Sequence, residues 1–123
     1  MGICLLIILL GGTTMNLHID TFVENKETVL KLSGEIDAHT APKLKTTLLE
    51  LLSEENNNVV VDLEEVSYMD STGLGVFISA LKQSKDQNSS FKLINLQENV
   101  YRLFNITGLD EVIHIVNNVR GGE

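Results

Sequence analysis

Ser71 lies in residues 68–75, which have the sequence YMDSTGLG. Of all stretches of this chain, this one has the residue types and spacing that point most clearly to a chemical role. The stretch joins a β-branched run, 59–63, to a segment in which Leu74, Phe77, Ile78 and Leu81 have the three-and-four spacing of an apolar helix face. Ser71 is therefore expected at a helix N-terminus, where the dipole and free N–H groups tolerate added negative charge. The sequence predicts a phosphorylation site there, which would add about −1.5 to −2 charges without unfolding the domain.

A second interpretation of Asp70 and Ser71 requires no partner protein. Either side-chain oxygen can cap a helix by accepting a hydrogen bond from a free backbone N–H group. Capping and phosphorylation are compatible, and the short motif alone does not separate them. Gly73 and Gly75 indicate an additional constraint, because glycine inside a helix costs about 1 kcal/mol relative to alanine. A flat surface or a close backbone approach would explain them.

The motifs of an enzyme are missing from the sequence. Gly73 and Gly75 begin a dinucleotide-binding pattern, but Ile78 stands where the third glycine would fall, and no Gly-Lys-Ser/Thr phosphate loop occurs. Ser71 is not in a Gly-x-Ser-x-Gly elbow. We therefore expect a regulatory binding protein without a cofactor, in which Ser71 is a substrate and not a nucleophile.

The composition excludes several further classes of function. The chain has 123 residues, enough for one domain, and a net charge of −8 with only nine scattered Lys and Arg residues, which argues against binding nucleic acid. Cys4 is the only cysteine, and His18, His39 and His114 lie far apart in the sequence, so no metal site is expected.

Residues 1–14 are interpreted as an extension outside the domain, which would then span 15–123. The apolar run 3–10 is shorter than the roughly 20 residues needed to cross a bilayer, and it lacks the basic start of a signal peptide. Residues 11–15 (GGTTM) can be encoded by a sequence containing GGAGG, a bacterial ribosome-binding site, which suggests Met15 as the true start. The competing interpretation is an apolar tail that binds a membrane or packs on the core. Without such a tail, a cytoplasmic protein with no membrane contact is expected.

The remaining pattern predicts a single α/β domain. Alternating residues predict a hairpin of strands 17–23 and 28–34, and a helix follows with Thr40 as its cap and Pro42 near its first position. Strands are also predicted at 91–96 and 111–116, with a helix before Gly108 between them. The expected fold is a mixed, mostly parallel sheet of about five strands with three to four helices. The loops after Ile36 and Met69 should then lie at one edge of the sheet.

Three motifs in this order resemble those of the bacterial anti-sigma factor antagonists, which are single-domain proteins of the STAS fold. The motifs are MDSTGLG at 69–75, GEID at 34–37 and RLFNITGL at 102–109. The similarity extends from about Met15 to the C-terminus, and it is strongest to the antagonists that regulate general-stress and sporulation sigma factors.

The resemblance implies a partner-switching cycle that controls transcription. The unphosphorylated antagonist binds an anti-sigma factor, itself a serine kinase, and so frees the sigma factor. The kinase then phosphorylates the antagonist and the complex dissociates, until a serine phosphatase removes the phosphate.

Carried over to this chain, the resemblance implies that Ser71 is the phosphoacceptor. The docking surface around it would contain Asp70, Thr72, Gly73, Leu74 and Gly75. Asp37 would be a second contact, and His39 and Thr40 are further candidates. The alternative is a STAS accessory domain of a transport or lipid-trafficking system, which would lack the phosphoswitch.

Overall fold

The computed structural model describes residues 17–116, so the predicted extension 1–14 lies outside the described residues. Strands and helices alternate along this range. In chain order they are β1 (Leu17–Glu24), β2 (Glu27–Ile36), α2 (Ala41–Leu52), β3 (Asn58–Met69), α3 (Ser71–Asp86), β4 (Ser90–Ile94), α4 (Glu98–Thr107), the 3-10 turn η1 (Leu109–Glu111) and β5 (Ile115–Val116).

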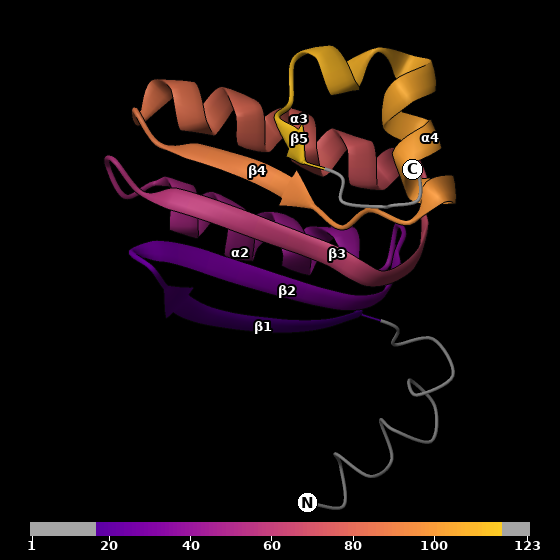
Figure 1. Ribbon diagram of the computed structural model, residues 1–123, viewed down its shortest axis with the longest axis horizontal. Helices are drawn as coiled ribbons and strands as arrows, with labels where there is room; N and C mark the ends of the chain where they lie inside the picture. Colours follow the sequence, from indigo (N-terminus) through magenta and orange to yellow (C-terminus); the bar gives the residue numbers. More distant parts are fainter. Residues whose placement is uncertain (1–16, 117–123) are drawn as a thin grey trace, which may run out of the picture.

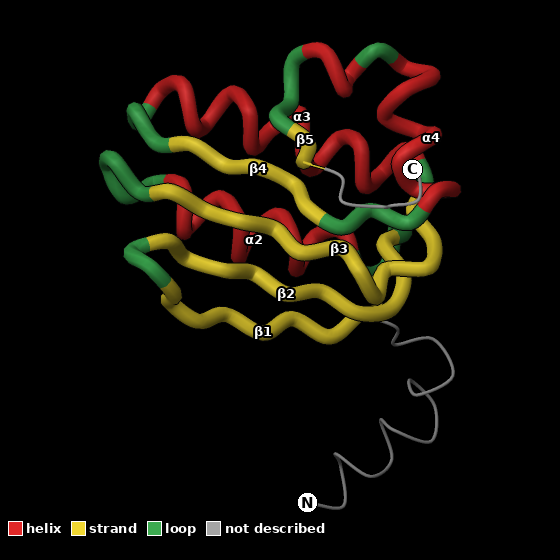
Figure 2. The backbone as a smooth tube through the Cα atoms, in the orientation of Figure 1, coloured by secondary structure: helices red, strands yellow, loops and turns green. Residues whose placement is uncertain are grey.

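The strands form one sheet in the order β1-β2-β3-β4-β5 (Figures 1 and 2). β1 and β2 are antiparallel, and every other neighbouring pair is parallel. The β1–β2 hairpin turns through Asn25 and Lys26, whose φ angles of 55° and 67° are those of a turn that matches the twist of the two strands. The predicted fold class, a mixed and mostly parallel sheet of five strands, is confirmed.

The hydrophobic core lies between the sheet and the pair of helices α2 and α3, which run side by side behind one face of the sheet (Figure 1). Phe77 of α3 stands at its centre, with its ring centroid 5.8 Å from that of Phe104 in α4 and 6.4 Å from that of Phe91 in β4. Aromatic pairs at this separation add to the stability gained from burial alone. The three rings therefore join α3, α4 and β4 into one core.

The buried face of α3 differs from the prediction at one position. Ile78 is 49% exposed, whereas Ala80 and Ser84 face the core together with Leu74 and Phe77. Ile78 follows Phe77 directly, so the helix turns it about 100° away from the core. A neighbouring pair of large apolar residues leaves the direction of the face ambiguous in the sequence, and the prediction for Ile78 was wrong.

The bounds of two strands also differ. β3 extends beyond the β-branched run 59–63, through Met69, because β2 pairs with it over that length. The strand predicted at 111–116 is reduced to Ile115–Val116. Here the N–H groups of residues 112 and 113 donate back to the carbonyl of Leu109, which continues a helical turn in place of a strand.

Side-chain amides support β3 beyond the end of β4. Because β4 stops at Ile94, the second half of β3 has no neighbouring strand on that side. Alternate residues of the following segment supply donors in its place: Asn95 Nδ2 to Asp62 Oδ1 (3.3 Å), Gln97 Nε2 to the Glu64 carbonyl (2.9 Å) and Asn99 Nδ2 to the Ser67 carbonyl (2.9 Å). The last two bonds satisfy backbone carbonyls of β3 that have no neighbouring strand on that side. They hold the part of β3 that leads to Ser71.

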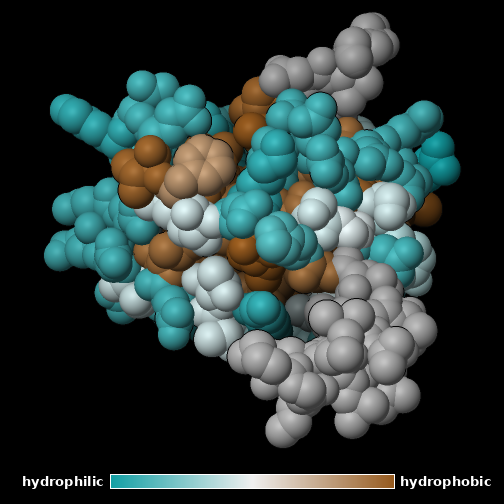
Figure 3. Space-filling view, turned by 90° about the horizontal axis from the view of Figure 1, so that it is seen from below, coloured by the Kyte–Doolittle hydropathy of each residue, from teal (hydrophilic) through white to brown (hydrophobic). Residues whose placement is uncertain are grey.

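The β1 edge of the sheet carries exposed apolar side chains. In the view from below, hydrophobic residues are separated by hydrophilic ones (Figure 3). Phe22 and Val23 are among the exposed hydrophobic residues, but Asp20 and Glu24 lie on the same strand. Charged residues on an edge strand oppose pairing with another chain, so this edge does not stand out as a binding surface.

We expect Phe77→Ala to lower the free energy of unfolding by about 3–5 kcal/mol, because it leaves a cavity between three packed rings. The matched variant, Ile78→Ala, should cost less than about 1 kcal/mol since its side chain is half exposed. Urea denaturation followed by circular dichroism measures both. Equal losses would mean that Ile78 packs in the core.

Candidate functional site

Two loops meet where β2 and β3 end. Ile36 and Met69, the last residues of these strands, are register partners in the parallel pair. The backbone N–H of Asp70 donates to the carbonyl of Ile36 over 3.3 Å, which extends the pairing by one bond. Asp37 follows Ile36 directly, and Ser71 follows Met69 after one residue, Asp70. The structure therefore brings the two predicted site loops together where the strands end.

Asp70 is the residue that caps α3. It has an extended backbone, with φ of −117°, and its carboxylate accepts from the Thr72 N–H at 2.9 Å and also from the Thr72 hydroxyl. Ser71 is the first residue of the helix and is exposed, and its hydroxyl has no hydrogen-bond partner within residues 17–116. Helix capping therefore gives Asp70 a structural role and uses both donors of Thr72. It gives Ser71 no structural role.

The loop after β2 is held by its own side chains. Asp37 Oδ1 accepts from the N–H groups of His39 (2.9 Å) and Thr40 (3.1 Å). The Thr40 hydroxyl donates to the Glu35 carbonyl (2.9 Å) and accepts from the Asp37 N–H (2.9 Å). Thr40 is the N-cap residue of α2, as predicted, but its hydroxyl makes no capping bond to the helix. These bonds fix the backbone of the loop, in which His39 is exposed.

Some of the predicted contact residues lie beneath the surface in the free domain. Thr40 is 3% and Leu74 7% exposed, and Gly73 is also buried. A Cβ atom on Gly73 would stand 2.7 Å from Met69 Sδ and 2.9 Å from Ile36 Cγ2. Gly73 is therefore required by the close approach of α3 to the two strand ends. These residues support the site from below, whereas Ser71, Thr72, Gly75 and His39 are exposed.

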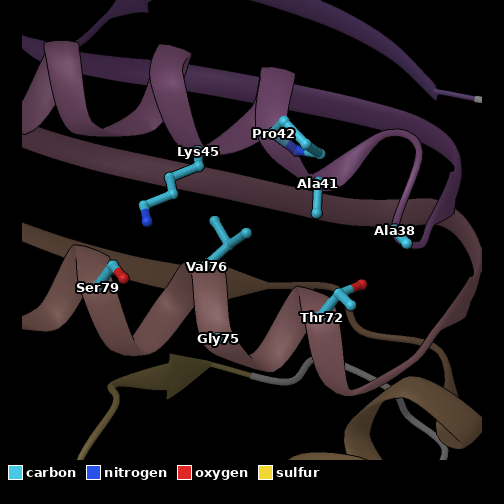
Figure 4. Close-up of a pocket in the computed structure, with 8 residues that line it drawn as sticks. All are labelled: Ala38, Ala41, Pro42, Lys45, Thr72, Gly75, Val76 and Ser79. Carbon is cyan, nitrogen blue, oxygen red and sulfur yellow. The ribbon is translucent and has the colours of Figure 1, made fainter.

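Gly75 has no comparable explanation inside the fold. It is exposed, and a Cβ atom built on it would meet nothing within 4 Å. The glycine still lowers the stability of the helix by about 1 kcal/mol relative to alanine. It lines a groove of about 550 Å³ between α2 and α3 (Figure 4). The groove is lined by Ala38, Ala41, Pro42, Lys45, Thr72, Gly75, Val76 and Ser79.

The sequence analysis did not identify this groove, although a signal was present. The lining residues follow the same spacing of i, i+3, i+4 and i+7 twice, from residue 38 and from residue 72. This is the spacing of one helix face, and both faces are made mainly of small side chains. What the sequence could not show is that the two faces lie opposite each other.

The structure adds two negative findings within residues 17–116. No group of three His, Cys, Asp or Glu side chains in this range could hold a metal ion. None of the helices there combines the length and the apolar character needed to cross a membrane.

We expect alanine substitutions at the two glycines to change the stability of the fold in opposite directions. Gly73→Ala should destabilise the fold by about 1–3 kcal/mol, because the methyl group must displace Met69 or Ile36. Gly75→Ala should stabilise it by up to about 1 kcal/mol, since the methyl group enters open space. Urea unfolding of both variants tests this, and a destabilised Gly75→Ala would reveal a structural role for Gly75 in the free domain.

Comparisons with known proteins agree with this architecture. The STAS domain family model matches residues 18–122. The anti-sigma-B factor antagonist of Bacillus subtilis (strain 168) is 43% identical over 108 residues, covering 88% of this chain and 98% of the relative. The predicted resemblance is therefore confirmed at the level of the sequence.

Solved structures show the same fold. An anti-sigma factor antagonist from Mycobacterium paratuberculosis superposes with a TM-score of 0.74 at 22% identity, covering 83% of this chain and 86% of that one. The Bacillus cell fate determinant SpoIIAA in its phosphorylated form gives a TM-score of 0.63 at 17% identity, covering 85% and 95%. The chain belongs to the STAS domain family, and its Bacillus subtilis relative is named an anti-sigma-B factor antagonist.

Proposed function

We propose that this protein is an anti-sigma factor antagonist whose binding is switched at Ser71. The unphosphorylated form binds an anti-sigma factor that is also a serine kinase, and so releases a sigma factor. Phosphorylation of Ser71 by that kinase ends the binding, and a serine phosphatase restores it. A cytoplasmic location follows from this role, because the sigma factor acts on transcription.

The unused hydroxyl of Ser71 is the observation that carries this proposal. Asp70 provides the cap, and the Thr72 hydroxyl is bonded to it. Ser71 thus presents an exposed hydroxyl at a capped helix terminus, at which a kinase can position a phosphate donor. The name of the Bacillus subtilis relative and the phosphorylated form of SpoIIAA support the same interpretation.

Electrostatics explain how the phosphate would end binding. In a complex that covers this surface, the phosphate dianion would be buried next to Asp70 and near Asp37, with desolvation and like-charge repulsion both opposing association. A penalty of roughly 3 kcal/mol weakens binding about a hundredfold. In the free domain the same phosphate would lie at the N-terminus of the 16-residue helix α3, whose dipole favours it, so the fold persists.

We expect Ser71→Ala to bind the anti-sigma factor at least as tightly as the wild type, and Ser71→Asp to bind at least tenfold more weakly. Each full-length variant serves as bait in a lysate of the source organism. The captured anti-sigma factor is identified by mass spectrometry, purified, and titrated with each variant by calorimetry. After addition of ATP, phosphopeptide analysis of the wild type should place the phosphate on Ser71.

Thr72→Ala is the matched control, because it removes the neighbouring hydroxyl and leaves Ser71 in place. It should still be phosphorylated. Loss of the phosphate in Thr72→Ala alone would assign the site to Thr72, and equal affinities of Ser71→Ala and Ser71→Asp would refute the charge switch. Capture of transport or lipid-trafficking components by both variants, without phosphate, would favour the accessory-domain alternative.

A further inference from the structure

The groove between α2 and α3 begins beside the proposed phosphorylation site. Thr72, the residue after Ser71, lines one end, and Ala38 of the Asp37 loop lies near it (Figure 4). Lys45 and Ser79 line the other end, two helical turns away. Any protein that covers Ser71 and the Asp37 loop therefore meets the open end of this groove.

The groove has an apolar floor and small walls. Ala41 is 6% and Val76 4% exposed, so both form the floor, and Gly75 leaves the wall on α3 open. The volume of about 550 Å³ falls among the sizes typical of pockets that bury a bound group, about 300–1,000 Å³. Since nothing in the fold requires glycine at position 75, the open space suits an apolar group supplied from outside.

Lys45 gives the groove a charge preference. It is the only cation among the lining residues, and within residues 17–116 it forms no ion pair, although the chain carries a net charge of −8. Lys43 lies on the same helix and is exposed, but it does not line the groove. A carboxylate beside the occupant would be complementary to Lys45.

We propose that the anti-sigma factor inserts an apolar side chain into the groove between α2 and α3 and places a neighbouring carboxylate against Lys45. This inference rests on the proposed function and extends the contact from Ser71 along both helices. The groove would supply binding energy that does not depend on the phosphorylation state, while Ser71 would supply the switch. The two contributions should therefore be separable by mutation.

Gly75→Leu and Lys45→Glu test the groove, and Lys43→Glu is the matched control for charge. Calorimetric titration with the purified anti-sigma factor should show affinities at least tenfold weaker for Gly75→Leu and Lys45→Glu, and a change below about twofold for Lys43→Glu, an exposed charge outside the groove. Thermal unfolding of Lys45→Glu and Lys43→Glu should match the wild type, because both lysines are exposed. Gly75→Leu should unfold at the same temperature or a higher one, because position 75 has open space and leucine favours a helix more than glycine does.

The outcomes separate this inference from the switch. If Ser71→Asp weakens binding but Gly75→Leu and Lys45→Glu bind like the wild type, the groove contact is refuted and the switch stands. If the wild type binds no anti-sigma factor, the proposed function and the inference fall together. Self-association of the wild type that Gly75→Leu abolishes, with unchanged binding to the anti-sigma factor, would assign the groove to a second copy and overturn the inference.

Discussion

The hydrogen bond from the Asp70 N–H to the Ile36 carbonyl joins the two strand ends on which the site depends. It continues the parallel pairing of β2 with β3 to the last residue of each strand. Because β2 and β3 both end at this point, the Asp37 loop and the start of α3 have to lie side by side. The same closeness brings α3 against Ile36 and Met69, where only glycine fits at position 73. The local sequence of the motif and the packing of the sheet therefore constrain each other.

The first residues of α3 divide structural and chemical roles among neighbouring side chains. Asp70 satisfies the helix terminus, and Thr72 is bonded to Asp70. Ser71 is left with an exposed hydroxyl on a backbone that other residues hold in place. A modification at such a position changes the charge of the surface while the bonds that define the terminus remain intact. This separation is what a reversible switch requires, because the fold has to survive in both states.

Much of this architecture could be predicted from the sequence, because the governing interactions are local. The β1–β2 hairpin follows from alternation and a polar turn. α4 ends at Thr107, before Gly108, which adopts the left-handed conformation with φ of 80°. The errors arise where tertiary contacts determine which residues are buried. The exposed Ile78 and the buried Ala80 depend on how α3 faces the sheet. The groove depends on two helix faces meeting, which neither face reveals alone.

The support of β3 explains why the motif at 102–109 belongs with the serine motif, although it lies far away in the sequence. Past the end of β4, the side chains of Gln97 and Asn99 at the start of α4 bond to β3, the strand that leads to Ser71. The other end of α4 is anchored in turn, because Tyr101 and Asn105 both donate to Asp110 in the following 3-10 turn. The position of Ser71 therefore depends on β2 on one side of β3 and on α4 on the other. A partner that recognises a single hydroxyl would need the position of that hydroxyl fixed to a fraction of an ångström. In this chain, contacts on both sides of β3 hold the position of Ser71.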